Sequence, residues 1–184
     1  TLESYSKARN AIRTGVMAHK RNRNVALGGH VTLFFEDEKT MRYQVQEMLR
    51  AEKIFDEAGI QDEIDAYNPL IPDGSNWKAT MMIEYEDIDE RRRMLSRMAG
   101  IEDRVWVKVA GFERVYAIAD EDLERTTGQK TSAVHFLRFE LSAAMSHALK
   151  KGAGLSMGVD HPACQAALDP VPEAVRKSLL HDLQ

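Results

Sequence analysis

The apolar residues of this chain of 184 residues repeat with two different periods, and the chain switches between them several times. Val105, Val107 and Val109 stand at every second position, as in a strand that buries one face. Residues 41–58 instead carry apolar side chains at helical spacing. Because helical and strand-like segments follow one another along the whole chain, the sequence predicts an α+β fold with a mostly antiparallel sheet packed against helices.

Local signals place the expected elements. Helical spacing predicts a first helix over residues 5–20 and one long helix over about residues 41–66, with Thr40 as its cap and Gly59 as the point where it breaks or bends. Gly28-Gly29 is a turn that a hairpin prefers, because glycine tolerates positive φ. The remaining expectations are strands within residues 77–87, 105–109, 114–120 and 131–141, helices within 87–100, after 141 and over 172–183, and turns at 67–76 and 158–164.

The composition is that of an ordinary soluble protein, with 29 acidic and 25 basic residues and a net charge of -4. This charge does not favour a nucleic-acid partner. Cys164 is the single cysteine, which excludes an internal disulfide and suits a reducing compartment. No apolar run approaches the roughly 18 residues of a membrane span, and no linker divides the chain. We therefore expect one cytoplasmic domain over residues 1–184 without a membrane anchor.

A glutamate interrupts the apolar stripe of the long predicted helix. At about 100° per residue, that stripe consists of Met41, Val45, Met48, Glu52 and Phe55. An ionised carboxylate that is buried without a partner costs several kcal/mol, so Glu52 is expected to meet a cation, a proton or a metal ion. Gln44 and Glu47 lie at the flank of the same stripe.

Two histidines are also predicted to point inward. His19 projects onto the apolar side of the first helix, and strand alternation groups His135 with Leu137 and Phe139. One hypothesis is that His19, Glu47, Glu52 and His135 converge, with Gln44 beside them, on a divalent metal ion or form a site for acid and base chemistry. The alternative is that each histidine is a hydrogen-bonded core residue and each glutamate is paired with an arginine.

The spacing and the remaining motifs limit these hypotheses. Glu47 and Glu52 are five residues apart and diverge by about 140° around a helix, so Gln44 with Glu47 is the better-spaced pair. Asp160 and His161 in "GVDHP" are expected in a turn, either as turn chemistry or as ligands. The sequence has no glycine-rich phosphate loop, no Gly-x-Ser-x-Gly elbow and no Glu-x-x-His pair. Nucleotide hydrolysis and serine chemistry are therefore disfavoured.

Several segments in a fixed order carry a resemblance: "MAHKRNRNVALGGHVTLFFEDEKTMRYQVQEMLRAEKI", "YNPLIP", "TSAVHFLRF" and "GVDHP". Over nearly the whole chain, this pattern resembles a bacterial family known as domain of unknown function 3501. The resemblance implies a cytosolic bacterial protein whose genes neighbour those of rubrerythrin-like and iron-sulfur oxidoreductase proteins. It brings no reaction with it. The positions that match the pattern are His19, Lys20, Arg23, Glu36, Gln44, Glu47, Arg50, Glu52, Asn68, His135, Arg138, Asp160 and His161.

Two classes of function follow. The inward carboxylates and imidazoles suggest a metal-binding protein linked to redox chemistry or oxidative stress, with a divalent metal ion as cofactor. The nine methionines, the basic helix face and the gene neighbours implied by the resemblance suggest instead a non-enzymatic partner or assembly factor for a rubrerythrin-like or iron-sulfur protein. A homodimer is compatible with both classes.

Overall fold

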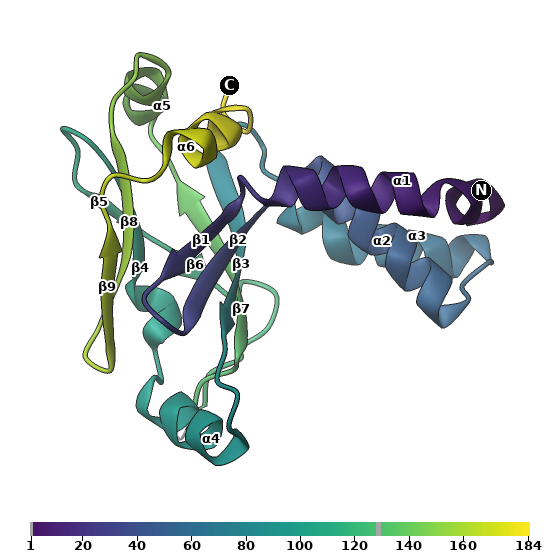
Figure 1. The fold of residues 1–184 in the computed structure, drawn as a ribbon, viewed down its shortest axis with the longest axis horizontal. Helices are drawn as coiled ribbons and strands as arrows, with labels where there is room; N and C mark the ends of the chain where they lie inside the picture. The colour runs from purple at the N-terminus through teal and green to yellow at the C-terminus, as the bar shows by residue number, and fades with distance from the viewer. Residues whose placement is uncertain (1, 128–129) are drawn as a thin grey trace.

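A computed structural model describes residues 2–127 and 130–184 of the chain (Figure 1). Its helices, with two 3-10 turns written η, are α1 (Leu2–Lys20), α2 (Glu38–Glu52), α3 (Glu57–Tyr67), η1 (Asn68–Leu70), α4 (Ile88–Arg97), η2 (Ile101–Arg104), α5 (Ala143–Lys150) and α6 (Glu173–Leu180). Its strands are β1 (Asn24–Leu27), β2 (Val31–Glu36), β3 (Asn76–Ile83), β4 (Val105–Val109), β5 (Arg114–Tyr116), β6 (Ile118–Ala119), β7 (Val134–Glu140), β8 (Leu155–His161) and β9 (Cys164–Leu168).

The strands form two sheets, one of five strands in the order β1-β2-β3-β7-β6 and one of four in the order β5-β4-β8-β9. Every neighbouring pair in both sheets is antiparallel. This confirms the predicted α+β class with its antiparallel pairing. The hairpin at Gly28-Gly29 is confirmed as well, because β1 and β2 pair across it.

The main core lies between the two sheets. Val105, Val107 and Val109 of β4 are fully buried in it, together with Leu137 and Phe139 of β7. The strand alternation therefore identified the inward face correctly. His135 belongs to this same face of β7 and is 0% exposed, so the prediction that it points inward is confirmed.

The segment predicted as one strand over residues 114–120 is shared between the sheets. β5 pairs with β4 in the four-stranded sheet, and β6 pairs with β7 in the five-stranded sheet. Between them, the Ala117 amide donates to the Val105 carbonyl at 2.9 Å. This crossing brings Asp120, the residue after β6, beside β7.

The helices α1, α2 and α3 lie side by side and project away from the sheets as an arm (Figure 1). The single helix predicted over residues 41–66 is wrong, because α2 ends at Glu52 and α3 begins at Glu57. The chain reverses at Lys53, whose φ of 57° and ψ of 42° are left-handed. Gly59, where a bend was expected, lies in the first turn of α3 and donates its amide to Asp56 at 2.8 Å.

Three local predictions are also corrected. Asp37 is the N-cap of α2, and Thr40 is its partner in a capping box rather than the cap itself. The turn expected at residues 67–76 begins later, because Asn68 has a helical backbone, with φ of −55° and ψ of −39°, as the C-cap of α3, and η1 follows α3. The turn expected at residues 158–164 is narrower, because Asp160 and His161 are the last residues of β8.

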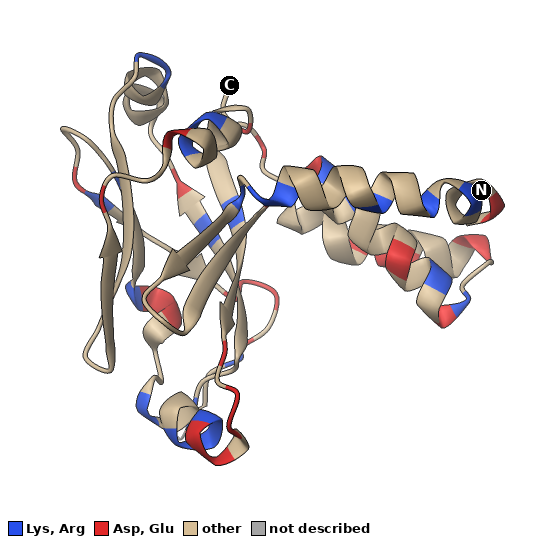
Figure 2. Cartoon of the chain, viewed as in Figure 1, with Lys and Arg blue, Asp and Glu red and all other residues tan. Residues whose placement is uncertain are grey.

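Charged residues are distributed unevenly over the arm, because α1 carries four basic side chains and one acidic one, whereas α3 carries four acidic side chains and no Lys or Arg. Figure 2 shows Lys and Arg along α1, and both signs of charge on α4. None of the helices described is long and apolar enough to cross a membrane.

Candidate functional site

The predicted convergence of His19, Glu47, Glu52 and His135 is not what the structure shows, because these side chains lie in different surroundings. Glu52 is exposed, so its prediction as an inward residue is wrong. Glu52 is the last residue of α2, and the apolar stripe is not covered at that end, since Phe55, its next member, is 72% exposed. Gln44 is half-buried on α2, and Arg50 and Asn68 are exposed.

Glu47 is paired with an arginine, as predicted by the alternative in which each glutamate pairs with an arginine. Its two carboxylate oxygens accept from Nε and Nη2 of Arg9 at 2.7 Å each, and Tyr5 donates its hydroxyl to the same carboxylate. These bonds tie α1 to α2. The Arg9 hydrogen bonds are the main reason that the pKa of Glu47 falls to about 2, and burial opposes them.

Replacement of Glu47 should make the arm less stable in a pH-dependent way. Because the folded-state pKa lies near 2 and the ordinary value is 4.5, the stabilisation is fully present above pH 4.5 and is lost as the pH falls toward 2. We expect Glu47→Gln to lower the free energy of unfolding by about 1 kcal/mol at pH 7 and to match the wild type near pH 2. Urea unfolding followed by helical circular dichroism measures this, with Glu63→Gln on α3 as the control. Equal stability of wild type and Glu47→Gln at pH 7 contradicts it.

His19 is paired with the residue that caps α2. Its Nε2 lies 2.5 Å from Oδ2 of Asp37, and Arg23 Nε lies 3.5 Å from the same oxygen. Burial alone would raise the pKa of Asp37, but the Arg23 charge, the Thr40 amide and His19 outweigh it and lower that pKa. His19 therefore helps to fix the junction of α1 and α2, and lies apart from His135.

Arg23 holds that junction to the C-terminal helix. Its side chain is 1% exposed and donates to the Phe35 and Glu36 carbonyls at 3.0 Å each. It also donates to the Ser178 carbonyl at 3.3 Å and to Oδ2 of Asp182 at 2.5 Å. Burial raises the pKa of Asp182, and the Arg23 contact opposes that rise. The motif residue Arg23 is thus a structural link between β2 and α6.

The other motif residues have local partners. Glu36 is buried and accepts from Thr40 at 2.6 Å and from Thr80 at 2.9 Å. Asp160 is exposed and accepts from Arg114 at 3.0 Å. His161 is buried, with Nε2 at 3.2 Å from the Ala99 carbonyl and Nδ1 accepting from the Ala163 amide at 3.1 Å. Lys20 is half-buried at the end of α1.

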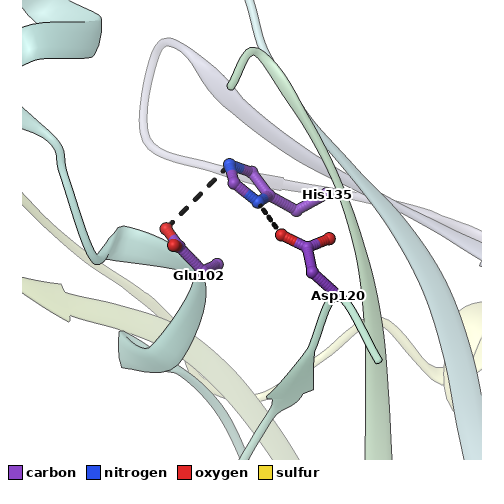
Figure 3. Close-up of side chains that lie close together, drawn as sticks. All are labelled: Glu102, Asp120 and His135. Carbon is purple, nitrogen blue, oxygen red and sulfur yellow. Dashed lines mark hydrogen bonds and ion pairs between the residues drawn. The ribbon is translucent and has the colours of Figure 1, made fainter. Parts of the chain in front are cut away.

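Of the predicted ligands, His135 is the one that belongs, among the described residues, to a group of three possible metal ligands (Figure 3). Its Nδ1 lies 2.5 Å from Oδ2 of Asp120, and its Nε2 lies 3.9 Å from Oε2 of Glu102. Thr131 Oγ1 lies 2.7 Å from the same Nε2. We call Glu102, Asp120 and His135 the buried triad; the sequence analysis identified only the last of them.

Three separate parts of the chain position the triad. Glu102 lies in η2, and Gly100, with a φ of 83°, turns the chain into it. Asp120 follows β6 with a φ of 50°, a left-handed conformation that is uncommon outside glycine. Two hydrogen bonds to Phe136 hold it there. The Asp120 amide donates to the Phe136 carbonyl at 2.8 Å, and the Phe136 amide donates to Oδ1 of Asp120 at 2.9 Å. Since β7 carries both Phe136 and His135, the strand fixes the imidazole and its carboxylate partner together.

The surroundings of the triad carry an excess of negative charge. An open pocket of about 330 Å³ adjoins it, and its charged lining residues are Glu102, Asp103, Asp120, Glu124 and Arg125. Burial, followed by the charges of Glu102 and Asp120, raises the pKa of Asp103. Arg125 contacts Asp120 at 3.1 Å, but it also neutralises Asp122 at 2.6 Å. A cation in this pocket would relieve the repulsion among the remaining carboxylates.

The triad has dimensions close to those of a coordination sphere. One ligand atom from each residue lies within 4.8 Å of the other two. Metal bonds to imidazole nitrogen and carboxylate oxygen are about 2.0–2.2 Å long, so three ligands around one ion stand about 3.3–3.8 Å apart. Ligand atoms 4.8 Å apart would therefore have to approach by about 1 Å to share an ion. In the part of the chain that the structure describes, this is the one group of three such residues.

The comparisons with known proteins identify the family. A family model described as "Protein of unknown function (DUF3501)" matches residues 1–183. No protein with a curated description matches the chain. A crystal structure of a "novel protein of unknown function" from Burkholderia pseudomallei K96243 is similar at 57% sequence identity and a TM-score of 0.95, over 100% of this chain and 95% of that one. This chain therefore belongs to the DUF3501 family.

Proposed function

We propose that Glu102, Asp120 and His135 bind a divalent metal ion, and that the protein is a metal-binding protein linked to redox chemistry. The observation that supports this most is the approach of three ligand atoms to within 4.8 Å beside an acidic pocket. Oppositely charged partners are scarce there. Among the described residues, Arg125 is the only arginine or lysine that lines the pocket, and it is shared with Asp122.

The donor set favours particular ions. One imidazole nitrogen with two carboxylates suits manganese, iron(II) or zinc better than magnesium or calcium, which prefer oxygen ligands alone. Cys164 belongs to β9 in the other sheet, and burial raises the pKa of its thiol. We therefore do not count a thiolate among the ligands of the proposed site. Manganese or iron would give the site the redox chemistry that the proposal assigns to it.

Asp120 has a second task at such a site. Because its Oδ2 lies 2.5 Å from Nδ1 of His135, it orients the ring through that nitrogen, and Nε2, which lies 3.1 Å from the Ser132 carbonyl and 3.9 Å from Glu102, would exchange its present bonds to bind an ion. Carboxylates that orient a metal-binding histidine in this way contribute 10–100-fold to metal affinity, a typical range for such partners. Thr131 contacts both Nε2 and Glu102, at 2.7 Å and 3.2 Å, and would exchange these bonds when an ion binds.

Metal titration of untagged, chelator-treated protein tests the proposal. We expect one manganese, iron(II) or zinc ion per chain by calorimetry. The melting temperature should rise by roughly 5–10 °C at a hundredfold excess of metal over Kd, because such binding adds about 2.7 kcal/mol to the free energy of unfolding. Asp120→Asn should lower the affinity by about 10–100-fold. His147→Gln, which removes an exposed histidine of α5, should leave it unchanged. Absence of saturable binding, or equal binding by Asp120→Asn, contradicts the proposal.

A further inference from the structure

A second, smaller pocket lies where η1 and the end of α3 meet β3 and β7. It measures about 140 Å³, and its lining includes Lys78 and Arg138. These two residues stand directly opposite each other in the register of β3 and β7. Like charges in that position destabilise a sheet, so the pair needs compensation.

The available carboxylates compensate Arg138 rather than Lys78. Arg138 donates from Nε and Nη2 to the two oxygens of Glu121 at 2.7 Å each, and from Nη1 to Glu140. Asp122, which also lines the pocket, is bound by Arg125 at 2.6 Å. On the other side of Lys78 in the sheet, Glu36 stands in register but accepts from Thr40 and Thr80.

Lys78 is a half-buried positive charge without a direct ion pair, although carboxylates lie in its surroundings. Among residues 2–127 and 130–184, its ammonium has no hydrogen bond or ion pair. Burial, followed by the Arg138 charge, lowers the pKa of Lys78, although Glu121, Asp73 and Glu140 act in the opposite direction. An anion beside this ammonium would make the direct ion pair that these three carboxylates do not make with it.

The rest of the wall is apolar. Ala66, Pro69, Leu70 and Phe136 are among the residues that line the pocket. Its volume is roughly ten times the 10–15 Å³ that a cavity needs to hold one water molecule, so a small organic molecule can enter. The pocket thus combines one free positive charge with a short apolar wall.

We propose that this pocket binds a small carboxylate, with its anionic group held by Lys78 and its short hydrocarbon chain against Leu70 and Phe136. The proposal is independent of the metal site. Asp120 lines the acidic pocket, whereas its neighbour Glu121 lines this one, so the two pockets lie on opposite sides of the same short loop.

Titration with butyrate, and with neutral butyramide as the matched control, tests this site by amide chemical shifts of isotope-labelled protein. We expect saturable butyrate-dependent shifts at Leu70 and Phe136, and affinity at least about tenfold weaker for butyramide, because only the carboxylate can pair with an ammonium. Lys78→Met should weaken butyrate binding by the same factor. Lys108→Met, which removes an exposed lysine of β4, should not change it. Equal affinity for butyrate and butyramide, or for wild type and Lys78→Met, overturns the proposal.

A stability measurement keeps the test decisive if binding is weak. In buffer free of carboxylates, Lys78→Met should melt at a higher temperature than wild type, because it removes a partly desolvated charge that faces Arg138. Butyrate should then raise the melting temperature of wild type and not that of Lys78→Met. A lower melting temperature for Lys78→Met would show that the ammonium has a structural partner and would overturn the proposal. Since both experiments are done with chelator present, their outcome is separate from that of the metal titration.

Discussion

Arg23→Met should lower the free energy of unfolding by about 3–5 kcal/mol, the usual loss when one member of a buried ion pair is removed. The Arg23 side chain is 1% exposed and Asp182 is 6% exposed, so the carboxylate that remains cannot recover water. The substitution also removes the donors to the Phe35 and Glu36 carbonyls. A loss of this size should shift the melting temperature by on the order of 10 °C in a chain of this length.

The pH dependence of that loss identifies Asp182 as its source. Because burial raises the folded-state pKa of Asp182 above its ordinary value of 3.8, its contribution to stability is fully present below pH 3.8 and is lost as the pH rises through the folded-state pKa. Without Arg23 that pKa rises further. The deficit of Arg23→Met should therefore grow between pH 4 and pH 7.

Two further variants separate this explanation from a general effect of losing an arginine. Arg23→Met combined with Asp182→Asn should recover at least half of the loss, because no unpaired charge remains. Arg21→Met, which removes an exposed arginine from the same segment, should remain within about 0.5 kcal/mol of wild type. Urea unfolding at both pH values measures all four proteins. A deficit below about 1 kcal/mol for Arg23→Met would be inconsistent with a buried pair.

Glu102→Gln should abolish metal binding while leaving the metal-free protein as stable as wild type or more stable. Thr126 and Thr131 donate to different oxygens of Glu102, so glutamine keeps one acceptor and can donate its amide group to the other hydroxyl, and it removes one of the charges that raise the pKa of Asp103. Loss of an anionic ligand should lower metal affinity by more than the roughly 10–100-fold that is typical for a residue of the outer shell. A substitution that removes binding without lowering stability is expected at a functional site.

A purely structural triad predicts the reverse. If Glu102 served only to bind Thr126 and Thr131, its charge would strengthen both bonds, and Glu102→Gln would cost about 1.5–3 kcal/mol. Glu124→Gln is the matched control, because Glu124 lines the same pocket and is exposed. Thermal unfolding with chelator, followed by calorimetric titration of the same samples, distinguishes the two accounts. Destabilisation of metal-free Glu102→Gln by more than about 1.5 kcal/mol rejects the functional one.

The fold could be predicted wherever the signal was local. Alternation along β4 and β7 identified the inward faces, including that of His135, because successive strand residues point to opposite sides. The break between α2 and α3 could not be read in the same way, because it depends on a left-handed backbone at Lys53, a residue with no preference for it. The projection of Glu52 failed for another reason, because spacing identifies one face of a helix but not how far along the helix that face is covered.

The composition of the triad depends on contacts between distant segments. Glu102 and Asp120 look like ordinary surface acids in "GIEDRV" and "AIAD". They approach His135 because the chain changes sheets at Ala117, which carries Asp120 from the strand beside β4 to the strand beside β7. The residue pattern within either segment does not indicate that the chain passes from one sheet to the other. The sequence could supply the imidazole of the triad but neither of its carboxylates.

Anomalous diffraction from crystals soaked in manganese or zinc tests the metal site most directly. We predict one strong peak per chain, about 2.0–2.2 Å from a ring nitrogen of His135 and from a carboxylate oxygen of Glu102, with Asp120 in contact with either the ion or the imidazole. A triad that stays without a peak under these conditions, with the Asp120 and Thr131 bonds to His135 unchanged, would contradict the metal site.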